Sequence, residues 1–106
     1  EVPEGPYLMT DIDDGRGRLN TKPSVREANI LKEKRSPYLT FEGIIHAIVF
    51  PEVFETHNMD LVGSRYKSGG VPFLYLTDGK PGLSYSWEDD AFPEWGAPSC
   101  GRRVAA

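Results

Sequence analysis

The sequence has one cysteine and no long hydrophobic segment, and each absence excludes a class of protein. Cys100 is the only cysteine among 106 residues, so no internal disulfide can form. No histidine lies near it in the sequence, and we interpret it as an unreactive thiol, with pairing to a partner chain left open.

No apolar run reaches the roughly 18 residues that a membrane-spanning helix needs. The chain begins at Glu1 and shows no signal peptide. A removed leader would place the protein in an organelle, a periplasm or outside the cell, so the compartment stays open.

A recognisable catalytic or metal-binding constellation is also missing. The two histidines, His46 and His57, have no nucleophile or carboxylate at a spacing typical of a triad. His46 lies in an apolar run, and we interpret it as a hydrogen-bonded core residue. Glu52, Glu55 and His57 offer metal-ligand atoms, but no second histidine at helical spacing and no nearby cysteine completes a set. We therefore expect no catalytic residues, no metal and no cofactor, and a non-enzymatic protein is favoured.

An aspartate-rich stretch near the N-terminus is similar to a calcium-binding loop. It reads Asp11-Ile-Asp-Asp-Gly-Arg-Gly-Arg-Leu-Asn20. With Asp11 at the first position, the sixth is Arg16 and the twelfth is Lys22, which cannot supply the bidentate carboxylate of such a loop. Arg16 and Arg18 would also repel a cation. We interpret the stretch as a tight Asp/Gly turn with locally paired arginines, and whether it binds a cation stays open.

The net charge and the chain length further restrict the possible partners and the number of domains. The formal net charge is −4, from 16 acidic and 12 basic side chains. Contacts to a phosphate backbone need a basic surface, so the composition argues against nucleic acid as a partner. About two-fifths of the residues are apolar, which indicates a globular chain, and the length fits one domain, residues 1–106.

Glycines and prolines divide this domain into three parts: an extended arm over 1–22, a core over 24–87 and an irregular tail over 88–106. Ser24-Val-Arg-Glu27 matches a capping box, and apolar residues recur every third position after it, which predicts a helix over about 25–35. The basic run at the end of that helix is typical of a solvated helix terminus.

The core beyond this helix is rich in strand-forming residues. Tyr38–Phe50 predicts extended structure with a bulge or bend at Gly43. Val71–Leu76 and Leu83–Trp87 flank an Asp-Gly turn and predict a hairpin, and 60–66 predicts another strand. The fold class is therefore α+β and mainly β: a small sheet or barrel of about four to six strands, with one N-terminal helix and long irregular terminal segments.

Four aromatic residues are the candidates for binding a partner: Tyr7 in the arm, Trp87 at the end of the predicted hairpin, and Phe92 and Trp95 beyond the last predicted strand. In the tail, large aromatics alternate with acids, and tryptophan anchors dominate many protein interfaces. The alternative is that these side chains fold back to cap a small core. We predict an accessory or structural subunit that docks onto a larger assembly of proteins through its arm and its aromatic-acidic tail.

Two segments resemble parts of known families. Ala47-Ile-Val-Phe-Pro-Glu-Val-Phe-Glu55 resembles the strand-to-turn segment of the OB domain in bacterial replicative polymerase alpha subunits. That resemblance implies an OB-like module that binds nucleic acid or another polymer, although the basic groove of such modules is missing. Gly70-Val-Pro-Phe-Leu-Tyr-Leu-Thr-Asp-Gly79 resembles the cis-proline strand and hairpin of thioredoxin-like domains, without their C-x-x-C motif.

Overall fold

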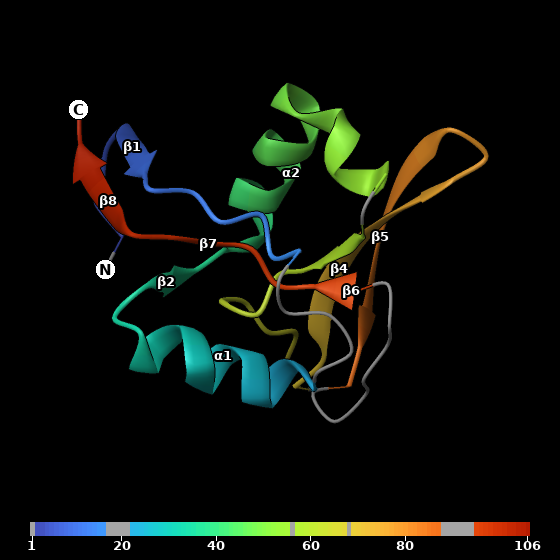
Figure 1. The fold of residues 1–106 in the computed structure, drawn as a ribbon, viewed down its shortest axis with the longest axis horizontal. Helices are drawn as coiled ribbons and strands as arrows, with labels where there is room; N and C mark the ends of the chain where they lie inside the picture. The colour runs from blue at the N-terminus through green and yellow to red at the C-terminus, as the bar shows by residue number, and fades with distance from the viewer. Residues whose placement is uncertain (1, 17–21, 56, 68, 88–94) are drawn as a thin grey trace.

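The computed structural model describes residues 2–16, 22–55, 57–67, 69–87 and 95–106. Two helices lie on opposite sides of the molecule, and the strands run between them (Figure 1). The helices are α1, Pro23–Lys32, and α2, Thr40–Val49, which continues into the 3₁₀ turn η1, Pro51–Glu55. The strands are β1 (Tyr7–Thr10), β2 (Ser36–Pro37), β3 (Asn58–Asp60), β4 (Val71–Thr77), β5 (Lys80–Ser86), β6 (Trp95–Gly96), β7 (Ser99–Cys100) and β8 (Arg102–Ala105).

The largest sheet has four strands in the order β5-β4-β3-β6. Its pairs are antiparallel, except that β3 and β6 are parallel. Two antiparallel ribbons complete the fold, β1 with β8 and β2 with β7. The β1–β8 ribbon lies at one end of the molecule beside both termini, and the β4–β5 hairpin projects at the other (Figure 1). The α+β, mainly β class is confirmed. The described residues hold eight strands in three sheets, however, because several pairings are only two residues long.

The helix predicted over 25–35 is present as α1, with different ends. It begins at Pro23, because the fixed φ of proline suits the first helical position. The N-cap is Lys22, whose side chain makes no capping hydrogen bond, so the capping box predicted at Ser24 is wrong. The helix stops at Lys32, and Lys34 then takes the left-handed conformation with φ 62°.

The predicted hairpin is confirmed as β4 and β5, which pair over seven residues each. The turn residues Asp78 and Gly79 have φ values of 52° and 76°, the pattern of a type I′ turn whose twist matches that of the two strands. Pro72 lies at the second position of β4, near the strand start, where a missing amide is tolerated. Its peptide bond is trans, since the described residues contain no cis peptide bond, so the thioredoxin-like cis-proline is wrong.

The extended structure predicted over Tyr38–Phe50 is wrong, because Thr40–Val49 is helical. The β-branched residues of this stretch favour a strand locally, but they recur with the 3.6-residue period of a helix. The start of α2 is fixed by the Glu42 carboxylate, which accepts a hydrogen bond of 2.8 Å from the Leu39 amide. The OB-like resemblance of Ala47–Glu55 required a strand in this segment. The segment instead forms the end of α2 and the 3₁₀ turn η1.

Two further corrections concern the ends of strands and the terminal segments. The strand predicted over 60–66 is β3, Asn58–Asp60, and the residues after it form turns. The terminal segments, predicted to be irregular, pair with each other in β1 and β8 over four residues each. Asp13 and Ser99 add an isolated bridge, with backbone hydrogen bonds of 2.9 and 2.8 Å.

The buried core consists of two small clusters. One includes Leu61, which packs against Gly43 of α2, and the other includes Ile30 of α1. The first contains Tyr38, Val53, Met59, Leu61, Leu74 and Cys100, and the second contains Ile30, Val62, Val71 and Ala97. A core of this size leaves little margin of stability, so the buried polar contacts that tie α1 and α2 to the sheets matter for folding.

Gly43 brings α2 close to this core, and this leads to a first testable expectation. A Cβ atom at Gly43 would lie 2.3 Å from Cδ2 of Leu61, which is fully buried and cannot swing aside. We expect Gly43→Ala to lower the free energy of unfolding by about 1–3 kcal/mol, because overpacking outweighs the better helix propensity of alanine. Urea denaturation measures this, with Gly5→Ala as the control, since nothing lies within 4 Å of a Cβ there. An unchanged midpoint for Gly43→Ala would contradict this packing.

Candidate docking face and groove

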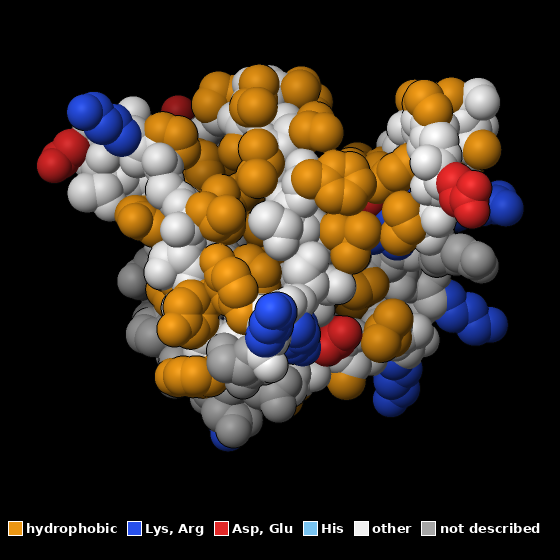
Figure 2. Space-filling view, turned by 180° about the vertical axis from the view of Figure 1, so that it is seen from behind, with side chains coloured by type: hydrophobic (Ala, Val, Ile, Leu, Met, Phe, Trp, Pro, Cys, Tyr) orange, Lys and Arg blue, Asp and Glu red, His pale blue; other side chains and the backbone are white. Residues whose placement is uncertain are grey.

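The helix α2 carries its large apolar side chains on the outside. Its buried positions are Glu42, Gly43 and His46, with exposures of 1% for Glu42 and 8% for His46. The outward side chains are between 38% and 74% exposed and recur at helical spacing. We call them the docking face: Phe41, Ile44, Ile45, Ile48, Val49 and Phe50. Figure 2 shows hydrophobic side chains gathered over α2 without an interrupting charge. Surface helices ordinarily turn such a stripe toward the core, so the amphipathicity of α2 is reversed.

Glu42 explains why the polar side of α2 faces inward. Its carboxylate accepts hydrogen bonds of 2.6 and 2.8 Å from the Arg103 guanidinium of β8 and one of 2.6 Å from the Tyr7 hydroxyl of β1. Burial alone would raise the pKa of Glu42, but the hydrogen bonds from Arg103, the Leu39 amide and Tyr7 outweigh it and lower the pKa. Burial, together with the hydrogen bond to Glu42, raises the pKa of Tyr7 to about 12. The β1–β8 ribbon is thereby fixed against the inner side of α2.

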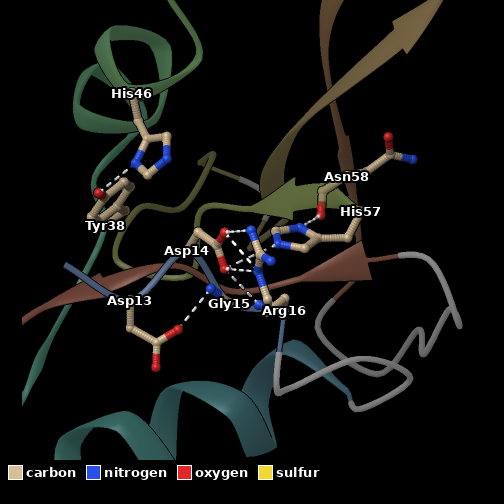
Figure 3. Close-up of polar contacts among 8 residues, drawn as sticks. All are labelled: Asp13, Asp14, Gly15, Arg16, Tyr38, His46, His57 and Asn58. Atoms are coloured by element: carbon tan, nitrogen blue, oxygen red, sulfur yellow. Dashed lines mark hydrogen bonds and ion pairs between the residues drawn. The ribbon is translucent and has the colours of Figure 1, made fainter. Parts of the chain in front are cut away.

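His46 makes the second inward contact of α2. The Tyr38 hydroxyl lies 2.7 Å from Nδ1 of His46 (Figure 3). Tyr38 is fully buried, and burial raises the pKa of its phenol, so it keeps its hydrogen and donates it to this nitrogen. Burial also lowers the pKa of His46. A neutral His46 that accepts at Nδ1 carries its proton on Nε2, which has no hydrogen-bond partner among the described residues.

An apolar groove runs along one side of the docking face. A cavity of about 620 Å³ lies between α2 and the N-terminal segment Val2–Met9. Phe41, Ile45 and Val49 line it from the helix, and His46 lies at its inner wall. Figure 2 shows a notch between α2 and the lobe that carries the β1–β8 ribbon. The groove therefore extends the apolar surface of α2 onto the arm.

A second cavity, also of about 620 Å³, continues from the first. The two share Ile12, His46 and Phe50, but the second is polar and lies at the C-terminal end of α2. Arg16 donates hydrogen bonds of 2.7–3.2 Å to the Asp14 carboxylate, and these lower the pKa of Asp14 to about 2 (Figure 3). The locally paired arginine expected for this stretch is therefore present at Arg16.

The carboxylates of the calcium-like stretch are occupied by protein donors. Asp11 forms an ion pair of 2.9 Å with Arg35. Asp13 accepts a hydrogen bond of 2.8 Å from the Gly15 amide, which is the tight turn predicted from the sequence (Figure 3). Across the described ranges, no group of three or more His, Cys, Asp or Glu residues is arranged to hold a metal ion. With Asp14 bound to Arg16, this loop presents no set of convergent ligand atoms.

His57 lies apart from the groove, in the packed region behind the loop. It is 2% exposed, and its Nδ1 lies 2.9 Å from the carbonyl oxygen of Asn58, to which it donates (Figure 3). Its Nε2 lies 3.7 Å from Oδ1 of Asp14. Glu52, Glu55 and His57 do not form a group of metal-ligand residues within the described part of the chain, and Glu52 lines the polar cavity.

The four aromatic candidates for partner binding have different surroundings. Tyr7 lines the apolar groove, with its ring 6.3 Å from that of Phe41 in an edge arrangement. Trp87 is 53% exposed beside Tyr85. Trp95 belongs to β6 and stacks on Phe73 at 4.1 Å, so the expectation that it lies beyond regular structure is wrong. Phe92 lies outside the described residues. A partner role for these side chains stays a prediction.

Cys100 is fully buried in β7 and belongs to the core cluster around Leu61. Burial raises the pKa of its thiol, which keeps it protonated and unreactive at neutral pH. Within the described ranges, no helix is long and apolar enough to cross a membrane.

The docking face was missed by sequence reasoning, although its signal was present. Apolar residues at 41, 44, 45, 48 and 49 follow the i, i+3, i+4, i+7, i+8 pattern of a helical stripe. Only the structure shows that this stripe points outward and that the arm forms the second wall of a groove.

A protein-family model matches the chain over all the elements described above. The chain belongs to the DUF5701 family. The family model matches residues 1–106, and the family is described as one of unknown function. No curated protein and no solved structure matches the chain. The fold and its surfaces are therefore the basis for a functional proposal.

Proposed function

We propose that the protein is an interaction module that docks another protein on the outer face of α2. The observation that supports this is the reversed amphipathicity of the helix. Five of its ten residues are large, apolar and exposed, whereas its polar Glu42 and His46 are buried. Leaving such a stripe in water is unfavourable, and contiguous apolar patches of several hundred Å² mark interaction sites on soluble proteins.

The size of the docking face suits a protein interface. Six large side chains that are about half exposed present on the order of 500 Å² of apolar surface. The adjoining groove adds the exposed Leu8 and Ile12 from the arm side. A standard interface covers roughly 800 Å² on each partner, with an apolar centre depleted of charge. The described surface supplies such a centre.

Charge favours a protein over a phosphate-rich partner. The net charge is −4, and the carboxylates Asp13, Asp14 and Glu52 line the cavity at one end of the docking face. Helices that lie on anionic membranes present Lys and Arg around their apolar stripe. Protein surfaces that bind nucleic acid also present Lys and Arg, which contact the phosphates. The exposed side of α2 has no basic residue.

The arm, which the sequence predicts to bind a partner, also belongs to the proposed interface. The arm contributes one wall of the groove, so a partner on α2 would also contact Tyr7 and Leu8. Trp87 lies elsewhere, at the end of β5, and a role of the aromatic-acidic tail in the same assembly remains a separate prediction.

The test places a photo-crosslinking residue at position 48 in the native host. Ile48 is 74% exposed at the centre of the docking face, whereas Leu31 is 56% exposed on α1 and serves as the matched control. We expect position 48, and not position 31, to give one discrete cross-linked protein, which is identified by mass spectrometry and remade from purified components.

Lysine substitution then measures the contact in the purified complex. Ile48→Lys is expected to weaken binding by about 2 kcal/mol, or roughly 30-fold in Kd, and to change stability by less than about 0.5 kcal/mol. Leu31→Lys is expected to change neither quantity. A large loss of stability in Ile48→Lys with binding intact would show that the stripe serves the fold.

A further inference from the structure

The apolar groove and the polar cavity form one continuous path along α2. They share Ile12, His46 and Phe50, so the path begins beside Phe41 and ends near Glu52, beyond the last turn of the helix. A partner segment in this path therefore meets apolar side chains first and charged ones at its end. This gradient restricts the chemistry of the partner.

The polar end carries excess negative charge. Asp11, Asp13, Asp14 and Glu52 line it together with Arg16 and Arg35, so carboxylates outnumber guanidinium groups by two. Arg16 is paired with Asp14, and Arg35 with Asp11. Asp13 and Glu52 have no cationic partner among the described residues. The carbonyl end of α2 lies at the same place and adds partial negative charge. A Lys or Arg of the partner fits this position.

His46 marks the point where the two cavities meet. His46 is 8% exposed, and its Nδ1 accepts the hydrogen bond from the Tyr38 hydroxyl. The proton on Nε2 has no acceptor within the described part of the chain, and His46 lines both cavities. Nε2 itself is not one of the buried polar atoms that lack a partner, so this N–H is open to the cavity, where an acceptor from the occupant of the groove can bind it.

One kind of partner would satisfy all three features: the apolar groove, the acidic end and the N–H of His46. We infer that the occupant is an amphipathic helix whose last turn carries Lys or Arg, and this inference rests on the proposed docking function. Apolar side chains of the helix pack against Phe41, Ile45 and Val49 in the groove. The last turn of a helix has carbonyl groups without intrahelical partners, which accept from Nε2 of His46. Its terminal cations then reach Asp13 and Glu52.

The orientation follows from the same positions. The unpaired carbonyls and the basic residues both belong to the C-terminal turn of the partner helix, and both contacts lie at the C-terminal end of α2. The two helices therefore run parallel. The partner cations offset the unfavourable proximity of two helix ends that carry like partial charges.

Two synthetic helical peptides of identical composition test this inference. Both have 16 residues and the same leucine stripe, but one carries two lysines in its last turn and the other carries them in its first turn. Fluorescence anisotropy with the full chain measures both affinities. At 50 mM salt we expect the peptide with C-terminal lysines to bind about fivefold more tightly, because two ion pairs form with the acidic end. At 0.5 M salt the difference is expected to fall below twofold, since screening weakens exposed pairs.

Matched variants separate the acidic end from the docking face. The double variant Asp13→Asn and Glu52→Gln is expected to abolish the difference between the two peptides. Asp78→Asn, in the distant hairpin turn, is expected to preserve it. Ile48→Lys is expected to weaken both peptides alike. Equal affinity of the wild-type chain for both peptides, or binding of neither, would overturn the inference. The proposed docking function is judged independently by the cross-link at position 48.

Discussion

Replacing Arg26 with methionine is expected to lower the free energy of unfolding by about 3–5 kcal/mol. Arg26 of α1 is 1% exposed, and its guanidinium contacts the Asp60 carboxylate of β3, which is fully buried. This ion pair links α1 to the centre of the four-stranded sheet. Methionine fills most of the space of the arginine but leaves Asp60 without its cation. An unpaired buried charge is among the largest single causes of destabilisation.

The loss of stability in Arg26→Met should depend on pH. Burial outweighs the attraction of Arg26 and raises the pKa of Asp60 from its ordinary 3.8 to about 6. Because the pKa of Asp60 is higher in the folded state than in the unfolded state, its contribution to stability falls as pH rises from about 4 through 6. Without Arg26 this pKa rises further. The loss in Arg26→Met should therefore be larger at pH 8 than at pH 5, where Asp60 can take a proton.

Urea denaturation at pH 5 and pH 8 measures both effects. The double variant Arg26→Met with Asp60→Leu is the control, because replacing both partners by apolar residues of similar size removes the unpaired charge. We expect it to recover most of the lost stability and to lose the pH dependence. A change of less than about 1 kcal/mol in Arg26→Met at pH 8 would contradict a fully buried pair.

The sequence predicts the local elements of this fold and not the long-range ones. The hairpin follows from Asp78 and Gly79, because a two-residue turn with positive φ at both positions is specified within the turn itself. α1 follows from its periodicity and from Pro23. The β1–β8 ribbon joins Tyr7 to Ala105, and nothing within either segment specifies the other.

The candidate site shows the same division. α2 is rich in isoleucine and valine, and its local propensity favours a strand. Its helical state depends on a polar inner side that is satisfied from 61 residues away, by Arg103 at Glu42. Tyr7 was chosen from the sequence as a partner residue, and it lines the groove. The docking face itself required knowing which side of α2 the ribbon covers.

Replacing Glu42 with alanine is the second substitution expected to have a large effect. Arg103 is 5% exposed at its side chain and would lose both hydrogen bonds to the carboxylate. The Tyr7 hydroxyl and the Leu39 amide would lose their acceptor as well. We expect a loss of about 3–5 kcal/mol in the free energy of unfolding, because a buried cation is left without its counter-ion. The β1–β8 ribbon would also detach from α2, so amide exchange at Leu8 should accelerate.

The pH profile distinguishes this ion pair from that of Asp60. The hydrogen bonds to Glu42 prevail over burial and lower its pKa below the ordinary 4.5. A carboxyl whose pKa is lower in the folded state contributes stability above the unfolded pKa and loses it as pH falls through the folded pKa. The wild-type chain should therefore lose stability on acidification below about pH 4.5, and Glu42→Ala should lack this part of the loss. Glu42→Gln keeps the shape and one acceptor oxygen and should show an intermediate loss at pH 7. If Glu42→Ala instead retains the acid limb and the slow exchange at Leu8, the ribbon is held to α2 by packing alone and the polar inner side of the helix has no structural role.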